Sequence, residues 1–325
     1  MLFKSNTFQL LLCLLLTLSG CAGIGSQTSG NQEMTIYGAP KNDDSLYSRF
    51  APLVRAIGTE AAYNRIGKVS AIINNDQDDF KLVIDPRFPV YYVQKQDFIS
   101  ARGASYTNLI YRVHFSEVPF YHLTSGANVG LLIYLTLNDQ NQPVLVTTLH
   151  TCGCYLAIVP TSYLPADALP NNWNPTLQNV YGESLPGVLD YGLREDLKVL
   201  VDLRAATHRV TDIRLIQANE TPQGFQQSVM LEPMDSLNSI PLQDQKISFF
   251  ETSGFRKGYV KGSHKPFEML LMGWWALDPL IGEDKALGPY QNTGTHMYTS
   301  LKFWARQNSD IWDFPTFLTY WGWRL

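Results

Sequence analysis

The sequence predicts an α+β fold: one domain with a β-rich, sandwich-like core, an N-terminal helical lead-in and a C-terminal helix plus an aromatic tail. Three observations predict it. From Lys68 onward, short segments alternate apolar and polar positions between polar turns, as half-buried strands do. Residues 44–57 instead repeat apolar side chains at helical spacing. Six of the seven tryptophans lie between Trp274 and Trp323, a density typical of a chain end that packs into a core.

Residues 1–20 predict a lipoprotein signal peptide. One positive charge, Lys4, precedes an apolar run from Leu10 to Leu18, which is shorter than the roughly 20 residues of a membrane-spanning helix. Small residues then stand directly before Cys21. This arrangement resembles lipoprotein signals, and the resemblance implies cleavage before Cys21, lipidation of its sulfur and acylation of its nitrogen with a chain such as palmitate. Three acyl chains exceed the two signals that stable anchoring requires.

The alternative is a plain signal peptide or a short signal anchor with a chance cysteine. The residue after Cys21 is Ala22, not the aspartate that typically retains lipoproteins in the inner membrane. The resemblance therefore implies the outer membrane of a Gram-negative cell, with the protein facing the periplasm. The expected function is a binding or structural role in the cell envelope, with an unknown envelope protein or ligand as partner.

The charge balance argues against one class of partner. Removing Lys4 with the leader leaves 24 of the 25 basic side chains against 29 acidic ones, which is a net charge of −5. No basic patch stands out along the chain. Nucleic acid is therefore not an expected partner.

The N-terminal part divides into a tether and a helical lead-in. Residues 21–43 are small and polar without periodicity, which predicts a flexible tether before a single domain over residues 44–325. The helix expected over residues 44–57 has Asp44 or Ser45 as its cap and a kink at Pro52.

Strands and turns are expected over most of the remaining chain. Residues 68–86 predict two strands around a polar turn, and residues 197–217 predict a hairpin. The clearest hairpin spans residues 128–161, where a long second strand follows a turn at 138–143. Residues 162–187, rich in proline and asparagine, predict a surface excursion.

The C-terminal part is aromatic. Residues 299–307 predict a helix, and residues 310–325 close the chain as a tail. Docking of the aromatic side chains into the core is the expectation. An exposed sugar-stacking surface and a membrane-interface belt are the alternatives.

The segment "HTCGC" concentrates the reactive side chains. In an extended strand His150, Cys152 and Cys154 project from one face, and the apolar residues on both faces predict a buried central strand. With Cys13 removed and Cys21 lipidated, these two thiols are the only ones left for the folded part. They pack as small apolar side chains, or they form a disulfide if the backbone bends at Gly153, as the oxidising compartment favours.

Metal binding is the alternative chemistry for this strand. Thiolates and imidazole suit zinc or copper, with His150, Cys152 and Cys154 as three ligands. The fourth ligand would be one of His114, His122 and His208. The C-x-C spacing is not that of zinc fingers, so no bound cofactor is the expectation, and a thiol-dependent enzyme is the remaining alternative. No catalytic residue can be assigned.

One family resemblance can be stated. The string "HTCGCY", together with "GYVKGS" and the closing "SLKFWARQNSDIWDF", resembles an uncharacterised family of Gram-negative envelope lipoproteins that share an H-x-C-G-C-Y strand motif. The likeness covers the C-terminal two-thirds of the chain. No activity is attached to that family, so the resemblance implies no catalytic residue and indicates only that the strand matters.

Overall fold

The computed structural model describes residues 32–40, 43–73, 80–194, 196–220 and 222–325. The chain divides into two units, Met1–Gln32 and Glu33–Leu325. The signal peptide and the lipidated Cys21 expected from the sequence lie outside the described residues. The second unit carries the fold.

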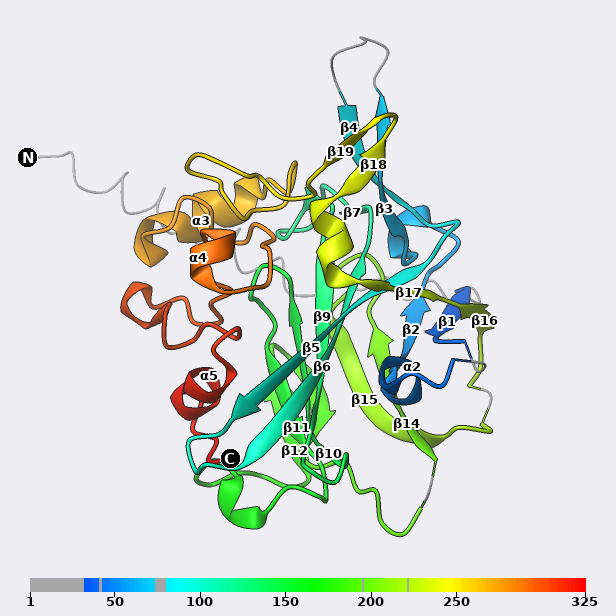
Figure 1. Ribbon diagram of the computed structural model, residues 1–325, viewed down its shortest axis with the longest axis vertical. Coiled ribbons are helices and arrows are strands. Elements are labelled where there is room, and N and C mark those ends of the chain that lie inside the picture. The colour runs from blue at the N-terminus through cyan, green and yellow to red at the C-terminus, as the bar shows by residue number, and fades with distance from the viewer. Residues whose placement is uncertain (1–31, 41–42, 74–79, 195, 221) are drawn as a thin grey trace, which may run out of the picture. The chain divides into compact units, whose positions relative to one another are not determined.

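Two sheets form the centre of this unit (Figure 1). The first has the strand order β15-β14-β2-β1-β16 and combines antiparallel with parallel pairs. Its strands are β1 (Met34–Gly38), β2 (Leu53–Ile57), β14 (Leu197–Leu203), β15 (Val210–Gln217) and β16 (Phe225–Ser228).

The second sheet has the order β11-β10-β9-β6-β5-β17 and is antiparallel apart from the β5–β17 edge. Its strands are β5 (Val90–Ile99), β6 (Ser105–His114), β9 (Gly130–Leu137), β10 (Pro143–His150), β11 (Ala157–Pro160) and β17 (Met230–Pro233). Short hairpins and turns complete the chain: β3 (Lys68–Ile73) with β4 (Phe80–Asp85), β7 (Glu117–Val118) with β8 (Gly126–Ala127), β12 (Leu177–Val180) with β13 (Glu183–Pro186), β18 (Ile240–Leu242) with β19 (Gln245–Ile247), and the 3-10 turns η2 (Ala62–Asn64), η3 (Ala166–Ala168) and η4 (Met234–Asn238).

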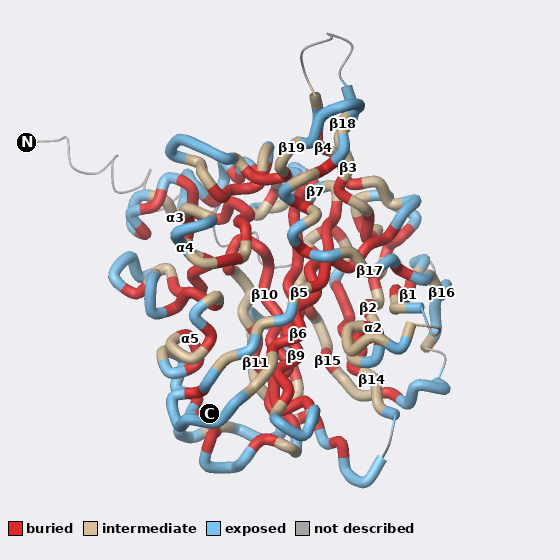
Figure 2. Tube along the Cα trace, in the orientation of Figure 1, coloured by how far each residue is buried: buried red, intermediate tan, exposed pale blue. Residues whose placement is uncertain are grey.

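The second sheet is buried on both faces. Every residue of β9 is buried, and alternate side chains enter different cores, since successive residues of a strand point to opposite faces. Leu131 and Ile133 join a cluster that also contains residues of the first sheet, which makes the pair of sheets a sandwich. Leu132 and Tyr134 join a second cluster with residues of the C-terminal part. Figure 2 shows the buried trace running through the middle of the unit.

The C-terminal part forms the third layer. It contains α3 (Pro266–Ala276), α4 (Tyr290–Thr293), η5 (Phe303–Ala305) and α5 (Phe314–Tyr320), which lie on the side of the second sheet opposite the first (Figure 1). In α5 the carboxylate of Asp313 accepts a hydrogen bond from the Thr316 backbone N–H and so caps the helix. Phe314 and Phe317 are buried from this helix. The predicted fold class, a β-rich α+β sandwich, is confirmed.

Two N-terminal predictions need correction. The predicted tether over residues 21–43 overlaps β1, so the folded part begins before Asp44. The helix predicted over residues 44–57 is only α2 (Leu46–Phe50), capped by Ser45 as expected, and the chain continues as β2. Pro52 explains the break, because the residue before a proline is disfavoured in helical conformation.

The aromatic C-terminal part is only partly a core element. Trp323 is buried, as core docking predicts, whereas Trp274, Trp275 and Trp304 are exposed. The helix predicted over residues 299–307 is reduced to η5. Among the described residues, the structure contains no helix with the length and apolar character needed to cross a membrane.

Candidate functional site

The "HTCGC" segment is a turn and not a continuous strand. β10 ends at His150, whose backbone N–H donates to the carbonyl of Cys154 at 2.9 Å, while the Gly153 N–H donates back to the carbonyl of His150 at 2.8 Å. The predicted central strand through residue 154 is therefore wrong. The chain takes up strand conformation again only at β11, which begins at Ala157.

Gly153 makes this turn possible. Its φ of 93° lies in the left-handed region that glycine tolerates and other residues avoid. A Cβ atom at this position would lie 1.9 Å from the carbonyl oxygen of Tyr298, so the C-terminal layer also touches the turn. Tyr155 has a φ of 57°, which is unusual for a residue with a side chain. The turn is held in a strained conformation by the layers around it.

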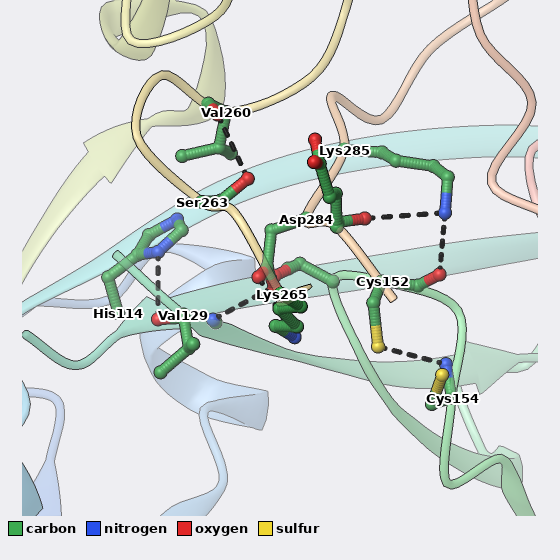
Figure 3. Close-up of polar contacts among 12 residues, drawn as sticks. His114, Val129, Cys152, Cys154, Val260, Ser263, Lys265, Asp284 and Lys285 are labelled. Carbon is green, nitrogen blue, oxygen red and sulfur yellow. Dashed lines mark hydrogen bonds and ion pairs between the residues drawn. The ribbon is translucent and has the colours of Figure 1, made fainter. Parts of the chain in front are cut away.

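The turn brings the two predicted thiols together. The backbone N–H of Cys154 points at Sγ of Cys152, with 3.4 Å between nitrogen and sulfur (Figure 3). Cys152 is buried, with 3% of its surface exposed, whereas Cys154 is partly exposed. Both are free thiols in the structure. The bend at Gly153 that a disulfide needs is therefore present, although the sulfurs are not bonded.

His150 does not join the sulfurs in a metal site. Its Nε2–H donates to the carbonyl of His208 at 3.2 Å. Within the described part of the chain, no three histidine, cysteine or acidic side chains are grouped to hold a metal ion. The arrangement predicted for zinc or copper, with His150, Cys152 and Cys154 on one strand face, is thus not the one observed.

The three candidate fourth ligands have other surroundings. His114 accepts a hydrogen bond from Nε of Arg112 at 2.8 Å and donates through Nδ1 to the Val129 carbonyl at 3.2 Å. His208 donates through Nε2 to the carbonyl of Tyr63 at 2.8 Å and stacks on Phe115. His122 is partly exposed in the loop between β7 and β8.

Buried charges surround the turn (Figure 3). Thr151 Oγ1 donates to the carboxylate of Asp284, and Nζ of Lys265 lies 3.2 Å from the other oxygen of that carboxylate. Lys285 reaches the turn twice: its backbone N–H donates to the Thr151 carbonyl at 2.8 Å, and its Nζ donates to the Cys152 carbonyl at 2.7 Å. Asp284, Lys285 and Lys265 are all buried, so the turn rests on an ionic cluster inside the protein.

The electrostatics distinguish the two sulfurs. A hydrogen bond from the Cys154 thiol lowers the pKa of Cys152; burial opposes this effect, and the positive charge of Lys265 supports it. The same hydrogen bond, followed by burial, raises the pKa of Cys154 well above its ordinary value. Burial alone would lower the pKa of Lys265, but the charges around it, with Asp284 foremost, raise it well above its ordinary value. Cys152 is therefore the sulfur that loses its proton more easily of the two, beside a cationic Lys265.

Helix α3 covers this cluster with an acidic side chain. Glu268 is buried, and its Oε2 has no hydrogen-bond partner within the described residues. A Cβ atom on Gly282 would lie 1.6 Å from that oxygen, so glycine is needed there to leave room for the carboxyl group. Burial raises the pKa of the Glu268 carboxyl group. The positive charge of Lys265 lowers this pKa, and the negative charge of Asp284 raises it.

Sequence reasoning identified the sulfurs but missed the charges. Lys265, Glu268, Asp284 and Lys285 stand in or beside glycine-containing loops, where charged residues usually face water. The run Gly282–Lys285, three charges among apolar neighbours, was the available signal. It carries no indication that the side chains are buried against a turn 133 residues away.

No family model, curated protein or solved structure matches this chain. The resemblance carried by "HTCGCY" therefore stays a prediction. The site must be interpreted from its own chemistry.

Two buried histidines beside the turn make stability depend on pH. Burial, followed by the charge of Lys265, lowers the pKa of His150 to about 3, and burial, followed by the neighbouring His150, lowers that of His208 to about 3. In the unfolded chain both titrate near pH 6.5. Below that pH each histidine binds a proton in the unfolded state but not in the folded state. The free energy of unfolding therefore falls as the pH drops from about 6.5 toward 3, by about 1.4 kcal/mol per pH unit for each histidine.

The variants His150→Gln and His208→Gln test this. Glutamine keeps an N–H donor but does not titrate, so each variant should flatten the slope of unfolding free energy against pH by one proton. Urea denaturation between pH 7 and pH 4 measures the slope. His264→Gln, at a side chain that is 65% exposed, is the matched control. An unchanged slope in both buried variants would contradict the prediction.

Proposed function

We propose that this protein is a lipid-anchored envelope protein whose folded part exchanges disulfides with a thiol-bearing envelope partner through Cys152 and Cys154. One observation carries the redox part: a glycine-bent turn places Sγ of Cys152 against the backbone of Cys154, next to the buried ammonium of Lys265. The anchoring part rests on the signal sequence that ends at Cys21. Paired thiols in an oxidising compartment tend to become disulfides, which supports the combination.

The different exposure of the two sulfurs sets the direction of attack. In the oxidised form, a partner thiolate attacks the partly exposed Cys154. A sulfur–sulfur bond forms between the partner and Cys154, the bond between Cys154 and Cys152 breaks, and its electron pair leaves on Cys152. A leaving thiolate of low pKa departs faster, and Lys265 stabilises the negative charge that Cys152 acquires.

A second partner thiolate completes the exchange. It attacks the partner sulfur of the mixed disulfide, so the partner gains a disulfide and Cys154 is released as a thiolate. Cys154 takes a proton from water, because its pKa is raised. Two electrons have then passed from the partner dithiol to the protein. The two partner thiols released two protons to the solvent when they ionised; one returns to Cys154, and the other returns to Cys152 when that thiolate is protonated. A bridge across a single glycine closes a small, strained ring, which favours its reduction.

Redox titration of the mature protein tests the proposal. The protein is equilibrated with mixtures of reduced and oxidised glutathione, and the remaining thiols are tagged with a maleimide that shifts mass. In the wild-type protein, the thiols of Cys152 and Cys154 should be oxidised together, so that both stop reacting with the maleimide in one two-electron transition. Cys152→Ser and Cys154→Ser should each keep one thiol that forms no internal bridge, which makes the two variants matched controls for each other.

Two outcomes would overturn the redox site. Thiols that both stay reduced in excess oxidised glutathione would show that the turn does not form a bridge. Stoichiometric zinc or copper in the purified protein, lost in either serine variant, would assign the sulfurs to metal binding instead.

A further inference from the structure

Helix α3 has its apolar side on the outside. Glu268 and Ala276 are its only buried residues, and Glu268 is also its only charged residue. The exposed side chains include Leu270 at 71% and Trp274 at 75%. The large apolar side chains of the helix that are exposed are Phe267, Met269, Leu270, Leu271, Trp274 and Trp275.

Neighbouring segments extend this face. Arg306 donates from Nη2 to the carbonyl of Ala276 at 2.7 Å, which ties the segment after η5 to the end of α3, and η5 itself carries the exposed pair Phe303 and Trp304. Trp304 is 68% exposed. We call α3 together with Phe303 and Trp304 the α3 surface.

We propose that the α3 surface docks on the phospholipid bilayer to which the chain is anchored, inserting its tryptophan and leucine side chains into the interface. The proposal rests on the proposed anchoring at Cys21. Tryptophan is enriched where a membrane meets water, because its ring is apolar and its N–H is polar. Helices that lie in the interface combine such rings with aliphatic side chains.

The composition favours lipid over sugar as the occupant. A sugar site needs hydrogen-bonding groups around its stacking rings, because each hydroxyl that loses water must find a partner. The exposed side of α3 has no charged side chain, and Met269, Leu270 and Leu271 offer no hydrogen bond to a hydroxyl. Acyl chains need no such partners.

The size of the face favours lipid over a second copy of the chain. An eleven-residue helix is about 16 Å long and about 10 Å wide, so its outer side covers only a few hundred Å². Stable protein interfaces bury roughly 800 Å² on each partner. A bilayer sets no such threshold for a protein that is already tethered to it, because tethering supplies a high effective concentration.

The predicted linkage keeps the bilayer within reach. Eleven residues, 22–32, separate Cys21 from Glu33, where the folded unit begins. Fully extended, they span at most about 40 Å. An anchor at Cys21 therefore holds the start of the folded unit within about this distance of the membrane surface, which keeps the exposed α3 at a high effective concentration of lipid.

Tryptophan quenching by brominated lipids tests the proposal. The mature protein, lipidated at Cys21, is reconstituted into vesicles of phosphatidylethanolamine and phosphatidylglycerol with and without bromine on the acyl chains. Bromine quenches only rings that enter the lipid. Wild type should be quenched, and the combined variant Trp274→Phe, Trp275→Phe, Trp304→Phe should lose most of that quenching. Trp173→Phe, at a ring packed 5.0 Å from that of Trp323, is the matched control and should keep it.

A second variant guards against effects on folding. Leu270→Glu should reduce the quenching while leaving the urea midpoint unchanged, because Leu270 is exposed. Fatty-acid labelling with Cys21→Ser as control reports the anchor separately. If the label is absent, the anchor fails and the docking with it. If the label is present, absent quenching, equal quenching in the combined variant, or a dimer that shields Trp274 overturns the docking alone.

Discussion

Replacing Asp284 with alanine lowers the free energy of unfolding by about 3–5 kcal/mol, because it leaves a buried ammonium without its counter-charge. Asp284 is fully buried and accepts a hydrogen bond from Thr151, while Lys265 lies 3.2 Å from its second oxygen. The substitution also removes the hydrogen bond that Thr151, in the turn that carries the two cysteines, donates to Asp284. Urea denaturation at pH 7 measures the change.

The matched control is another aspartate paired with a lysine. Asp97 lies 2.9 Å from Lys95, but both side chains are about half exposed or more, at 64% and 48%. Exposed pairs are screened by water and contribute about 0–1 kcal/mol, so Asp97→Ala should change stability little. Equal losses in the two variants would show that the cluster around Asp284 is solvated in solution.

Replacing Gly153 with alanine is the second large effect, a loss of roughly 2–5 kcal/mol. A side chain in the left-handed region costs about 1–2 kcal/mol, and overpacking adds about 1–3 kcal/mol. The overpacking is severe here because the new Cβ meets the backbone carbonyl of Tyr298 at 1.9 Å, and backbone cannot rotate away as a side chain can. Urea denaturation again gives the value.

Gly182 separates the two contributions. Its φ of 86° is close to the 93° of Gly153, but no heavy atom would lie within 4 Å of an added Cβ. Gly182→Ala should therefore cost only the conformational part, about 1–2 kcal/mol. If Gly153→Ala costs no more than Gly182→Ala, the close contact between the turn and Tyr298 does not persist in solution.

The local hairpins could be predicted from the sequence. Alternation of apolar and polar residues places β3 with β4 and β14 with β15 close to where they lie, and polar turns separate the partners. Such pairs are neighbours in the chain, so the information needed to form them is local.

Helix α3 could not be predicted by the same means. Sequence patterns identify a surface helix by an apolar stripe that faces the core and a polar stripe that faces water. Here the exposed positions are apolar and the single charged residue, Glu268, is buried, so no polar stripe marks the surface. The density of aromatic residues in the C-terminal part predicts packing into the core, although Trp274 is exposed.

The candidate site divides in the same way. From the sequence alone, Cys152 and Cys154 could be singled out as the two thiols of the folded part, and Gly153 as the residue that would permit a bend between them. Only the tertiary structure decided that the bend exists and that Lys265, Asp284 and Lys285 surround it. The reason is physical: apolar alternation records which way a strand faces, whereas a buried ion pair forms only once distant segments have been folded against each other.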